Sequence, residues 1–444
     1  MKKFYSLFFI TIYITSFLSK LSFPQEEKSP QKISLLDAIE IAKKNNLDII
    51  KAKEQINESY GYTKTIHSQI LPEFTGSVLN LRQQKSRVAL GLTDELNFLF
   101  PDYVGPYNLF GEEINMQFPV LNLKALNEFL SAKSNETLTE LQAKVVEENV
   151  ISQVSSLYFE VLRDIEAVKS TEENVKRYEK RLEVIKDKRK AGLATDIDVK
   201  SSEYELSKAK SELKVVQTQL TYSTTQLKQS LNIDISEDIE LTDTLIFQPI
   251  QPLEIETATD IALKQRPDFL AQKQKEKVDL YQVKSAKCSW IPEINIYGRY
   301  GREGEEISDI IPVWSIGIQL DIPIWDSFKR KGTLEQKESQ LLQTKDITEK
   351  VKAQIKNEIQ VIYEQMESAK NVVEVSIEYV ALEEERLKQK QDELKAGTAT
   401  QDDVFVAEVN LSKAKFQKID AIYKYNISKV NWFRALGNTS QIIE

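Results

Sequence analysis

The side chains that could take part in catalysis are few and isolated. His67 is the only histidine among 444 residues, and Cys288 is the only cysteine. A zinc site needs several such ligands, and a reactive thiol needs a basic partner, so neither residue indicates a site. A lone histidine is more often packed or solvated than catalytic. Gly298, Gly301 and Gly304 have the wrong spacing for a phosphate loop, and no helix start follows them. We therefore predict no catalytic residue, no cofactor, no metal and no enzymatic activity.

A ten-residue phrase that could end one helix and start the next occurs twice. KAGLATDIDV at 190–199 returns as KAGTATQDDV at 395–404, 205 positions later, with seven of ten residues identical. Gly192 and Gly397 stand where a left-handed C-cap falls, and the threonine three residues further on can cap the next helix. The phrase predicts the turn of a helical hairpin, and its return predicts an internally duplicated chain.

The helices that lead into these turns are predicted to be long. Residues 123–190 and 327–395 contain no Pro, and their only Gly, Gly332, lies in the first turns. At about 1.5 Å per residue each helix spans about 100 Å. Shorter helices return from the turns, over 195–231 and 400–436. Apolar residues follow a seven-residue spacing typical of coiled coils, at Val154, Val161, Val168, Val175 and Leu182 and again at Ile359, Met366, Val373, Val380 and Leu387.

Each half also begins with a helix that stops at a proline. The first runs from Ser34 to about Ile70 with a break near Asn46, and its copy covers Glu256 to Trp290. The prolines at 72 and 292 end both helices.

The period then changes from 3.6 to 2, which predicts a strand pair in each half, at about 73–120 and 293–322. Trp314, Ile316, Ile318, Leu320 and Ile322 alternate with small or polar residues, as in the wall of a transmembrane barrel. Four strands are too few to close a barrel, since about eight is the smallest number known, so several chains must share one. The alternative for a single strand is a half-buried soluble hairpin. The segments that leave the two strand pairs match, and they are Phe118 to Asn122 and Ile322 to Asp326. In each segment the Pro is expected to end the strand, and Asn122 or Asp326 is expected to cap the next helix.

Composition and charge narrow the function further. The formal net charge is -9, which gives no electrostatic case for binding nucleic acid. Gly and Pro number only 13 and 12, while 29% of residues are charged, as in long surface-charged helices. Lys2 and Lys3 precede an apolar run to Leu18 that is too short to span a membrane, so residues 1–23 are predicted to be a signal peptide.

The expected organisation follows from these elements. We predict a first structural repeat over 24–233, an equatorial connector over 234–255, a second repeat over 256–437 and a C-terminal tail over 438–444. The fold class is mainly α with a transmembrane β part.

The chain resembles the outer-membrane factor (TolC-like) family of export ducts. The resemblance rests on the duplicated phrase A-G-x-A-T-x-x-D-V, the Pro-bounded strand exits and the heptad helices, and it covers essentially the whole mature chain. It implies a homotrimer in the outer membrane of a diderm bacterium, with twelve strands in one β-barrel and a periplasmic α-barrel of coiled-coil hairpins. A periplasmic adaptor protein and an inner-membrane pump would complete an efflux or type I secretion system. The duct itself would contact outer membrane lipid and perform no chemistry.

The resemblance also implies roles for the turns. The adaptor would dock on the tips, formed by Gly192, Leu193, Ala194 and Thr195 with Gly397, Thr398, Ala399 and Thr400. Asp403 would form the pore constriction, with Asp402 beside it. For Asp198, a favourable position at a helix N-terminus is as good an explanation as a pore role.

The sequence departs from the family pattern at three positions near the second tip. Ala399 stands where an arginine is frequent, and Leu394 where an aromatic residue can stand. Val406 replaces a second acidic residue, so a single acidic ring is expected.

Two other functions compete with this one. A secreted coiled-coil scaffold would need no membrane part, and a diffusion porin would need no long helices. Sequence alone names neither the cargo nor the class of pump.

Overall fold

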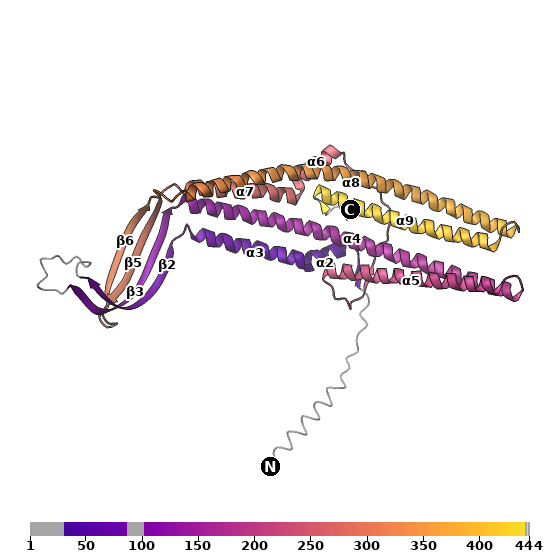
Figure 1. Ribbon diagram of the computed structural model, residues 1–444, viewed down its shortest axis with the longest axis horizontal. Helices are drawn as coiled ribbons and strands as arrows, with labels where there is room; N and C mark the ends of the chain where they lie inside the picture. The colour runs from indigo at the N-terminus through magenta and orange to yellow at the C-terminus, as the bar shows by residue number, and fades with distance from the viewer. Residues whose placement is uncertain (1–30, 87–101, 440–441, 443–444) are drawn as a thin grey trace, which may run out of the picture.

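The computed structural model describes residues 31–86, 102–439 and 442 (Figure 1). The predicted signal peptide lies outside these residues, as does part of the segment between the first two strands. The described chain is elongated, with a β-sheet at one end and two helical hairpin turns at the other (Figure 1).

The same order of elements occurs twice, and the long helices begin and end close to the predicted positions. The first copy contains α2 (Leu35–Asn45), α3 (Leu47–Ser68), β2 (Glu73–Ser86), β3 (Tyr103–Leu121), α4 (Leu123–Lys190) and α5 (Asp196–Leu231). The second contains α6 (Ile255–Gln265), α7 (Pro267–Cys288), β5 (Glu293–Gly304), β6 (Ile311–Asp321), α8 (Lys329–Lys395) and α9 (Gln401–Leu436). A short parallel pair, β1 (Gln31–Ile33) with β4 (Ile239–Leu241), was not predicted.

Half of the heptad residues lie in two core clusters, one in each repeat. α4 packs against α5, α8 packs against α9, and α4 also contacts α7 and α9. Val154 and Val161 are buried in one cluster, and Ile359, Met366 and Val373 in another. Full burial of each such side chain stabilises the folded protein by about 1.5–3 kcal/mol. In the part of the chain that the structure describes, no helix is both long and apolar enough to cross a membrane.

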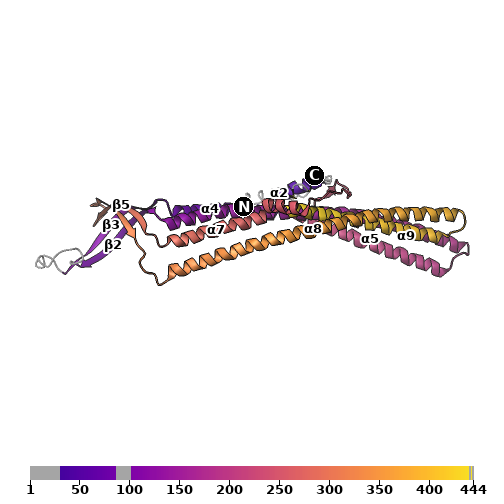
Figure 2. The ribbon, with the colours of Figure 1, turned by 90° about the horizontal axis from the view of Figure 1, so that it is seen from above.

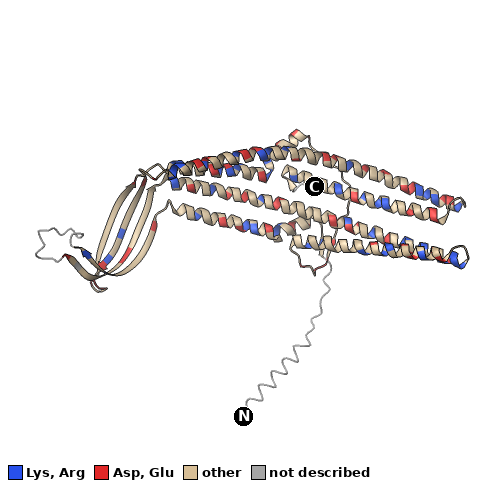
Figure 3. Cartoon of the chain, in the orientation of Figure 1, with Lys and Arg blue, Asp and Glu red and all other residues tan. Residues whose placement is uncertain are grey.

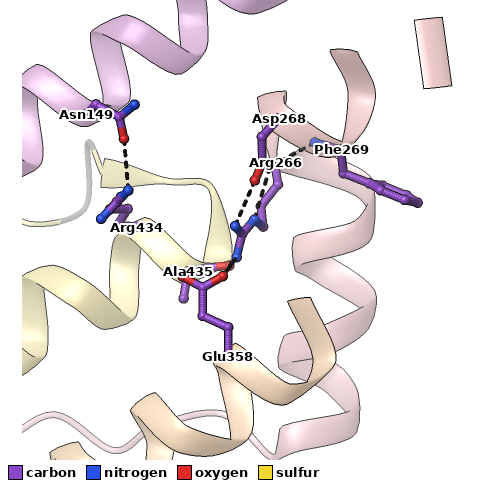
Figure 4. A network of polar contacts seen from close by, with 7 residues as sticks. All are labelled: Asn149, Arg266, Asp268, Phe269, Glu358, Arg434 and Ala435. Carbon is purple, nitrogen blue, oxygen red and sulfur yellow. Dashed lines mark hydrogen bonds and ion pairs between the residues drawn. The ribbon is translucent and has the colours of Figure 1, made fainter. Parts of the chain in front are cut away.

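The opening helix of each repeat breaks at a joint that the two repeats share. Between α2 and α3, Asn46 Nδ2 donates to the carbonyl of Ser230 at 2.8 Å. Between α6 and α7, Arg266 Nη1 donates to the carbonyl of Ala435 at 3.4 Å (Figure 4). Ser230 and Ala435 are again 205 residues apart. In both repeats the residue at the break therefore ties the opening helix to the end of the returning helix.

The second joint carries a charge network as well. Arg266 binds Asp268 at 2.8 Å and Glu358 of α8 at 2.7 Å (Figure 4). Gly437 passes so close that an added Cβ would lie 2.7 Å from the Arg266 Cα, and its φ is +75°. Glycine is required there both for the backbone angle and for the close approach.

In the described residues, the strands of the two repeats join in one antiparallel sheet of order β2-β3-β5-β6. β2 and β6 are its free edges. Its two faces differ, because Trp314, Ile316 and Ile318 of β6 are exposed on one face while their neighbours are small or polar. Charged residues are spread along the helices and sparse on the sheet (Figure 3).

Two details of the predicted strand exits were wrong. β3 does not end at Pro119 but continues to Leu121 after an irregularity in the register, because the proline's missing N–H is accommodated there. Asn122 caps α4 as predicted, accepting from the Ala125 amide at 2.8 Å. Asp326, however, is not the N-cap of α8, because that helix begins later and Phe328 occupies the cap position.

Candidate functional site

Both hairpin turns adopt the predicted conformation. Gly192 and Gly397 have φ of 75° and 77°, in the left-handed region that favours glycine. The next amide closes each turn, with Leu193 N donating to the Lys188 carbonyl at 2.8 Å and Thr398 N to the Glu393 carbonyl at 2.9 Å. These short bonds end the long helix and reverse the chain.

The returning helices start with the same capping box. Thr195 Oγ1 and N each donate to Asp198 Oδ2 at 2.7 Å. Thr400 Oγ1 and N donate to Asp403 Oδ2 at 2.6 and 2.8 Å. The hydrogen bonds from the side chain and backbone of Thr400 lower the pKa of Asp403, and those from the backbone and side chain of Thr195 lower the pKa of Asp198. Both carboxylates are therefore exposed, oriented and ionised.

Asp402 has a different environment from Asp403. Its carboxylate lies 3.4 Å from Arg181 of α4, so it connects the second hairpin to the first. The same guanidinium pairs with Glu205 of α5 at 3.1 Å and lies over the ring of Phe405, 4.1 Å from its centroid. Tyr178 meets Phe405 edge to face, with ring centroids 5.1 Å apart. We call Tyr178, Arg181, Asp402 and Phe405 the tip bridge.

The structure brings the predicted tip residues to one end of the molecule, where the two turns lie near each other (Figures 1 and 2). Leu193 is 78% exposed and Ile197 is 77% exposed. Gly192, Gly397, Thr195, Thr398 and Thr400 are also exposed, whereas Ala194 and Ala399 are partly buried. The exposed end of the molecule thus carries small and apolar side chains, and the helices that lead to it carry charged side chains.

Sequence reasoning missed three residues of the tip bridge, namely Tyr178, Arg181 and Phe405. A signal was present for the two aromatic residues, because the repeat is broken there. Phe405 corresponds to Lys200 and Tyr178 to Glu383 at the 205-residue offset. Where two copies of a repeat differ in an aromatic residue, the difference points to contacts between the copies.

His67 and Cys288, the two residues considered above for catalysis, each contact a neighbouring side chain. His67 stacks on Phe129, with ring centroids 4.6 Å apart. Cys288 Sγ accepts from Asn127 Nδ2 at 3.5 Å. Across the described residues, no group of three or more His, Cys, Asp or Glu side chains is placed to hold a metal ion.

The family model described as outer membrane efflux protein matches residues 38–232 and 258–438. Toxin and drug export protein A of Aggregatibacter actinomycetemcomitans is 20% identical over 296 residues, which are 66% of this chain and 62% of that protein. The toluene efflux pump outer membrane protein TtgF of Pseudomonas putida is 22% identical over 335 residues, 71% of this chain and 65% of that protein. This chain thus covers less than two thirds of the length of these curated relatives.

A solved structure shares the fold over nearly the full length. The outer membrane protein VceC from Vibrio cholerae superimposes with a TM-score of 0.77 and 16% identity, covering 91% of this chain and 96% of that one. The family match extends over both repeats and most of the described helices, strands and turns. The chain belongs to the outer membrane efflux protein family.

Proposed function

We propose that this protein is the outer-membrane duct of a tripartite efflux or type I secretion system. The observation that carries the proposal is the separation of two surfaces in one molecule. A sheet with an apolar outer face lies at one end, and exposed hairpin tips lie at the other, joined by helices of 68 and 67 residues. At about 1.5 Å per residue, about 100 Å of helix separates the membrane from the tips, which is a length suited to crossing a periplasm.

The duct is a homotrimer. Four strands with free edges at β2 and β6 leave unpaired backbone groups, which cannot remain so in a membrane. Three copies supply twelve strands, enough for a closed barrel. α8 also exposes Val361, Val372 and Val375, which a neighbouring helix would cover.

The tips dock a periplasmic adaptor, which in turn connects to an inner-membrane pump. Gly192 and Gly397 have no atom within 4 Å of an added Cβ, so the backbone there is open to a partner. Thr195, Thr398 and Thr400 add hydroxyl groups, and Leu193 adds apolar surface. Ala194 and Ala399 lie at the edge of the same surface.

Asp403 narrows the passage at the tips. Threefold symmetry would place three of these carboxylates around one axis, where acidic rings attract cations. Asp402 contributes less, since Arg181 neutralises much of its charge. Asp198, which is held like Asp403 in the other hairpin, is the third candidate for this constriction.

A pull-down from cells tests the function. Tagged full-length protein, extracted in neutral detergent, should co-purify with an adaptor and a pump, whereas Gly397→Glu should lose both and remain in the outer membrane. Gly61→Glu is the control, because Gly61 lies on an exposed face of α3 with nothing within 4 Å of an added Cβ. Recovery of the wild-type protein without either partner would favour a coiled-coil scaffold. A coiled-coil scaffold would not explain why the outer face of the sheet is apolar.

A further inference from the structure

In its half nearest the helices, the four-stranded sheet has one apolar face and one polar face. The strand register places Trp314 of β6 opposite Tyr300 of β5 on the apolar face. The neighbouring residues Ser315 and Arg299 are opposite each other on the other face. In the proposed barrel the apolar face meets lipid, so the polar face lines the lumen.

The lipid-facing side becomes polar towards the end of the sheet that lies far from the helices. Two residues beyond Tyr300, Arg302 forms an ion pair with Glu112 of β3, with Nη1 and Oε1 3.4 Å apart. The residues that follow on the same side are mostly polar, namely Asn80, Arg82, Asn108 and Phe110. Charged residues are costly in the middle of a bilayer and tolerated near its edges, so this ion pair marks the outer edge of the apolar band. The sheet beyond it lies outside the membrane.

The lumen-facing side changes in the opposite sense at the same level. Four side chains on this side are aliphatic, and we call them the outer collar: Leu79, Leu81, Leu109 and Ile311. In the single chain Leu79 is 47% exposed, Leu81 40% and Ile311 64%. Glu303 lies level with Leu79, but Arg299 binds it from the polar part of the lumen. Both faces of the sheet therefore exchange polarity where it leaves the membrane.

The sheet also bends at this level. An added Cβ at Gly301 would lie 2.5 Å from the carbonyl oxygen of Glu112 and 2.8 Å from the Cβ of Glu113. Gly301 and Glu113 are cross-strand partners on the lumen-facing side, so the crowding shows that the sheet is concave towards the lumen there. Glycine permits such a bend in a barrel strand. Beyond it, β2 and β3 continue further from the helices than β5 and β6 (Figure 1). The bend turns the collar towards the axis of the proposed barrel.

Lipid does not account for apolar side chains on the lumen side and outside the membrane. Adjacent exposed apolar residues of this kind are usually covered by a partner. Threefold symmetry would place three collars around one axis, so the apolar surface that faces each collar is the collar of another copy. A narrow apolar section of a pore loses its water and thereby blocks ions.

We propose that the outer collars of three copies meet at the mouth of the barrel and form a hydrophobic gate. The proposal rests on the proposed trimeric duct. It adds a second closure, at the opposite end of the molecule from the hairpin tips. While the collars are in contact, the mouth excludes water and ions, and cargo that arrives from the tips separates them.

Cysteine cross-linking of the full-length protein in outer membranes tests the contact between copies. In a Cys288→Ser background, Leu81→Cys should form disulfide-linked dimers on oxidation with copper phenanthroline, because its side chain faces the axis. Asn80→Cys is the matched control, since it is the neighbouring residue of β2 on the outward side and should remain unlinked. Absence of linked dimers in Leu81→Cys, or equal linking in both variants, would overturn the proposal.

Labelling from outside the cell tests the closure. Ser315→Cys, on the lumen face below the collar, should react slowly with a sulfonated dye maleimide that does not cross the outer membrane. Adding Leu81→Asn/Leu109→Asn should speed this labelling about tenfold, which corresponds to about 1.4 kcal/mol, because polar side chains keep the mouth wet. Phe110→Asn makes the same kind of replacement on the outward side of the same hairpin and should leave the rate unchanged.

Equal labelling rates with and without the collar leucines would overturn the gate, and so would an equal increase in Phe110→Asn. Protection of Ser315→Cys without disulfides in Leu81→Cys would assign the closure to another segment and also overturn it. Co-purification with adaptor and pump is independent of these outcomes. If both partners are still recovered, the proposed duct stands without an outer gate, whereas a wild-type protein that is only monomeric would remove the duct itself.

Discussion

At the scale of single residues, the charged groups of the tips divide into two kinds. Asp198 and Asp403 are oriented by a threonine of their own turn, three residues away. Asp402 and Arg181 connect different repeats. The first kind gives each tip its shape, and the second determines how the two tips sit beside each other.

Asp403 gives the most direct prediction at this scale. In planar bilayers, Asp403→Ala should lose cation selectivity, with the K⁺ to Cl⁻ permeability ratio falling towards one, because the acidic ring is removed. Thr400→Ala is the matched control, since it removes a partner of the same capping box but keeps the carboxylate. Unchanged selectivity in Asp403→Ala would place the constriction elsewhere.

Arg181 gives a prediction about the tip bridge. Arg181→Met keeps an apolar contact with Phe405 but loses the ion pairs to Asp402 and Glu205, which together are worth about 1 kcal/mol at a partly exposed site. We expect the second hairpin to move away from the first more readily, raising the open fraction of single channels about fivefold.

The control for Arg181 is Arg189→Met, since Arg189 pairs at 2.8 Å with Asp196 of its own hairpin. Equal gating in the two variants would show that the tip bridge does not hold the hairpins together.

At the scale of elements, each joint fixes the opening helix of its repeat to the end of the returning helix. The joint of the first repeat uses an amide, Asn46, and that of the second uses a largely buried guanidinium, Arg266. Burial alone would raise the pKa of Asp268, but hydrogen bonds and the charge of Arg266 lower it. We therefore expect the second joint to respond to acid.

The acid response of this joint has a definite sign. The pKa of Asp268 in the folded protein lies below the unfolded value of about 3.9. Its stabilising contribution is therefore complete above that pH and is lost as the pH falls through the folded-state pKa. The unfolding temperature of the wild-type protein should fall more steeply below about pH 4 than that of Asp268→Asn. Asp260→Asn, at an exposed position of α6, is the control and should behave as wild type. Parallel curves for wild type and Asp268→Asn would remove Asp268 from the acid response.

At the scale of the whole molecule, one chain is an open structure. The sheet has two free edges, and Val361, Val372 and Val375 of α8 remain exposed. Apolar residues repeated along one face of a long helix are expected to be covered in the assembly.

We therefore expect amine cross-linking of the detergent-solubilised protein to trap a species of about three times the chain mass of 51.1 kDa. Val375→Glu, which places a charge on the exposed apolar face of α8, should shift the population towards monomers. Only monomers in the wild-type protein would contradict the trimer, and unchanged trimers in Val375→Glu would exclude this face of α8 as the interface.

The sequence by itself determined the features that depend on neighbours a few residues away. Gly192, Gly397 and the two capping threonines specify the turns through backbone angle and hydrogen bonds within one helical turn. The heptad positions specify which face of each helix is buried, because periodicity is a local property. The duplication strengthened these predictions, because each pattern occurs twice in one chain.

Only the tertiary structure decided the contacts between distant segments. The strand order β2-β3-β5-β6, the bond from Arg266 to the Ala435 carbonyl and the pairing of Arg181 with Asp402 all join residues far apart in the chain. The start of α8 after Asp326 was decided in the same way, by how the chain leaves the sheet. The physical reason is that such contacts depend on how whole helices pack against one another. The local sequence does not specify which residues of two distant segments lie side by side.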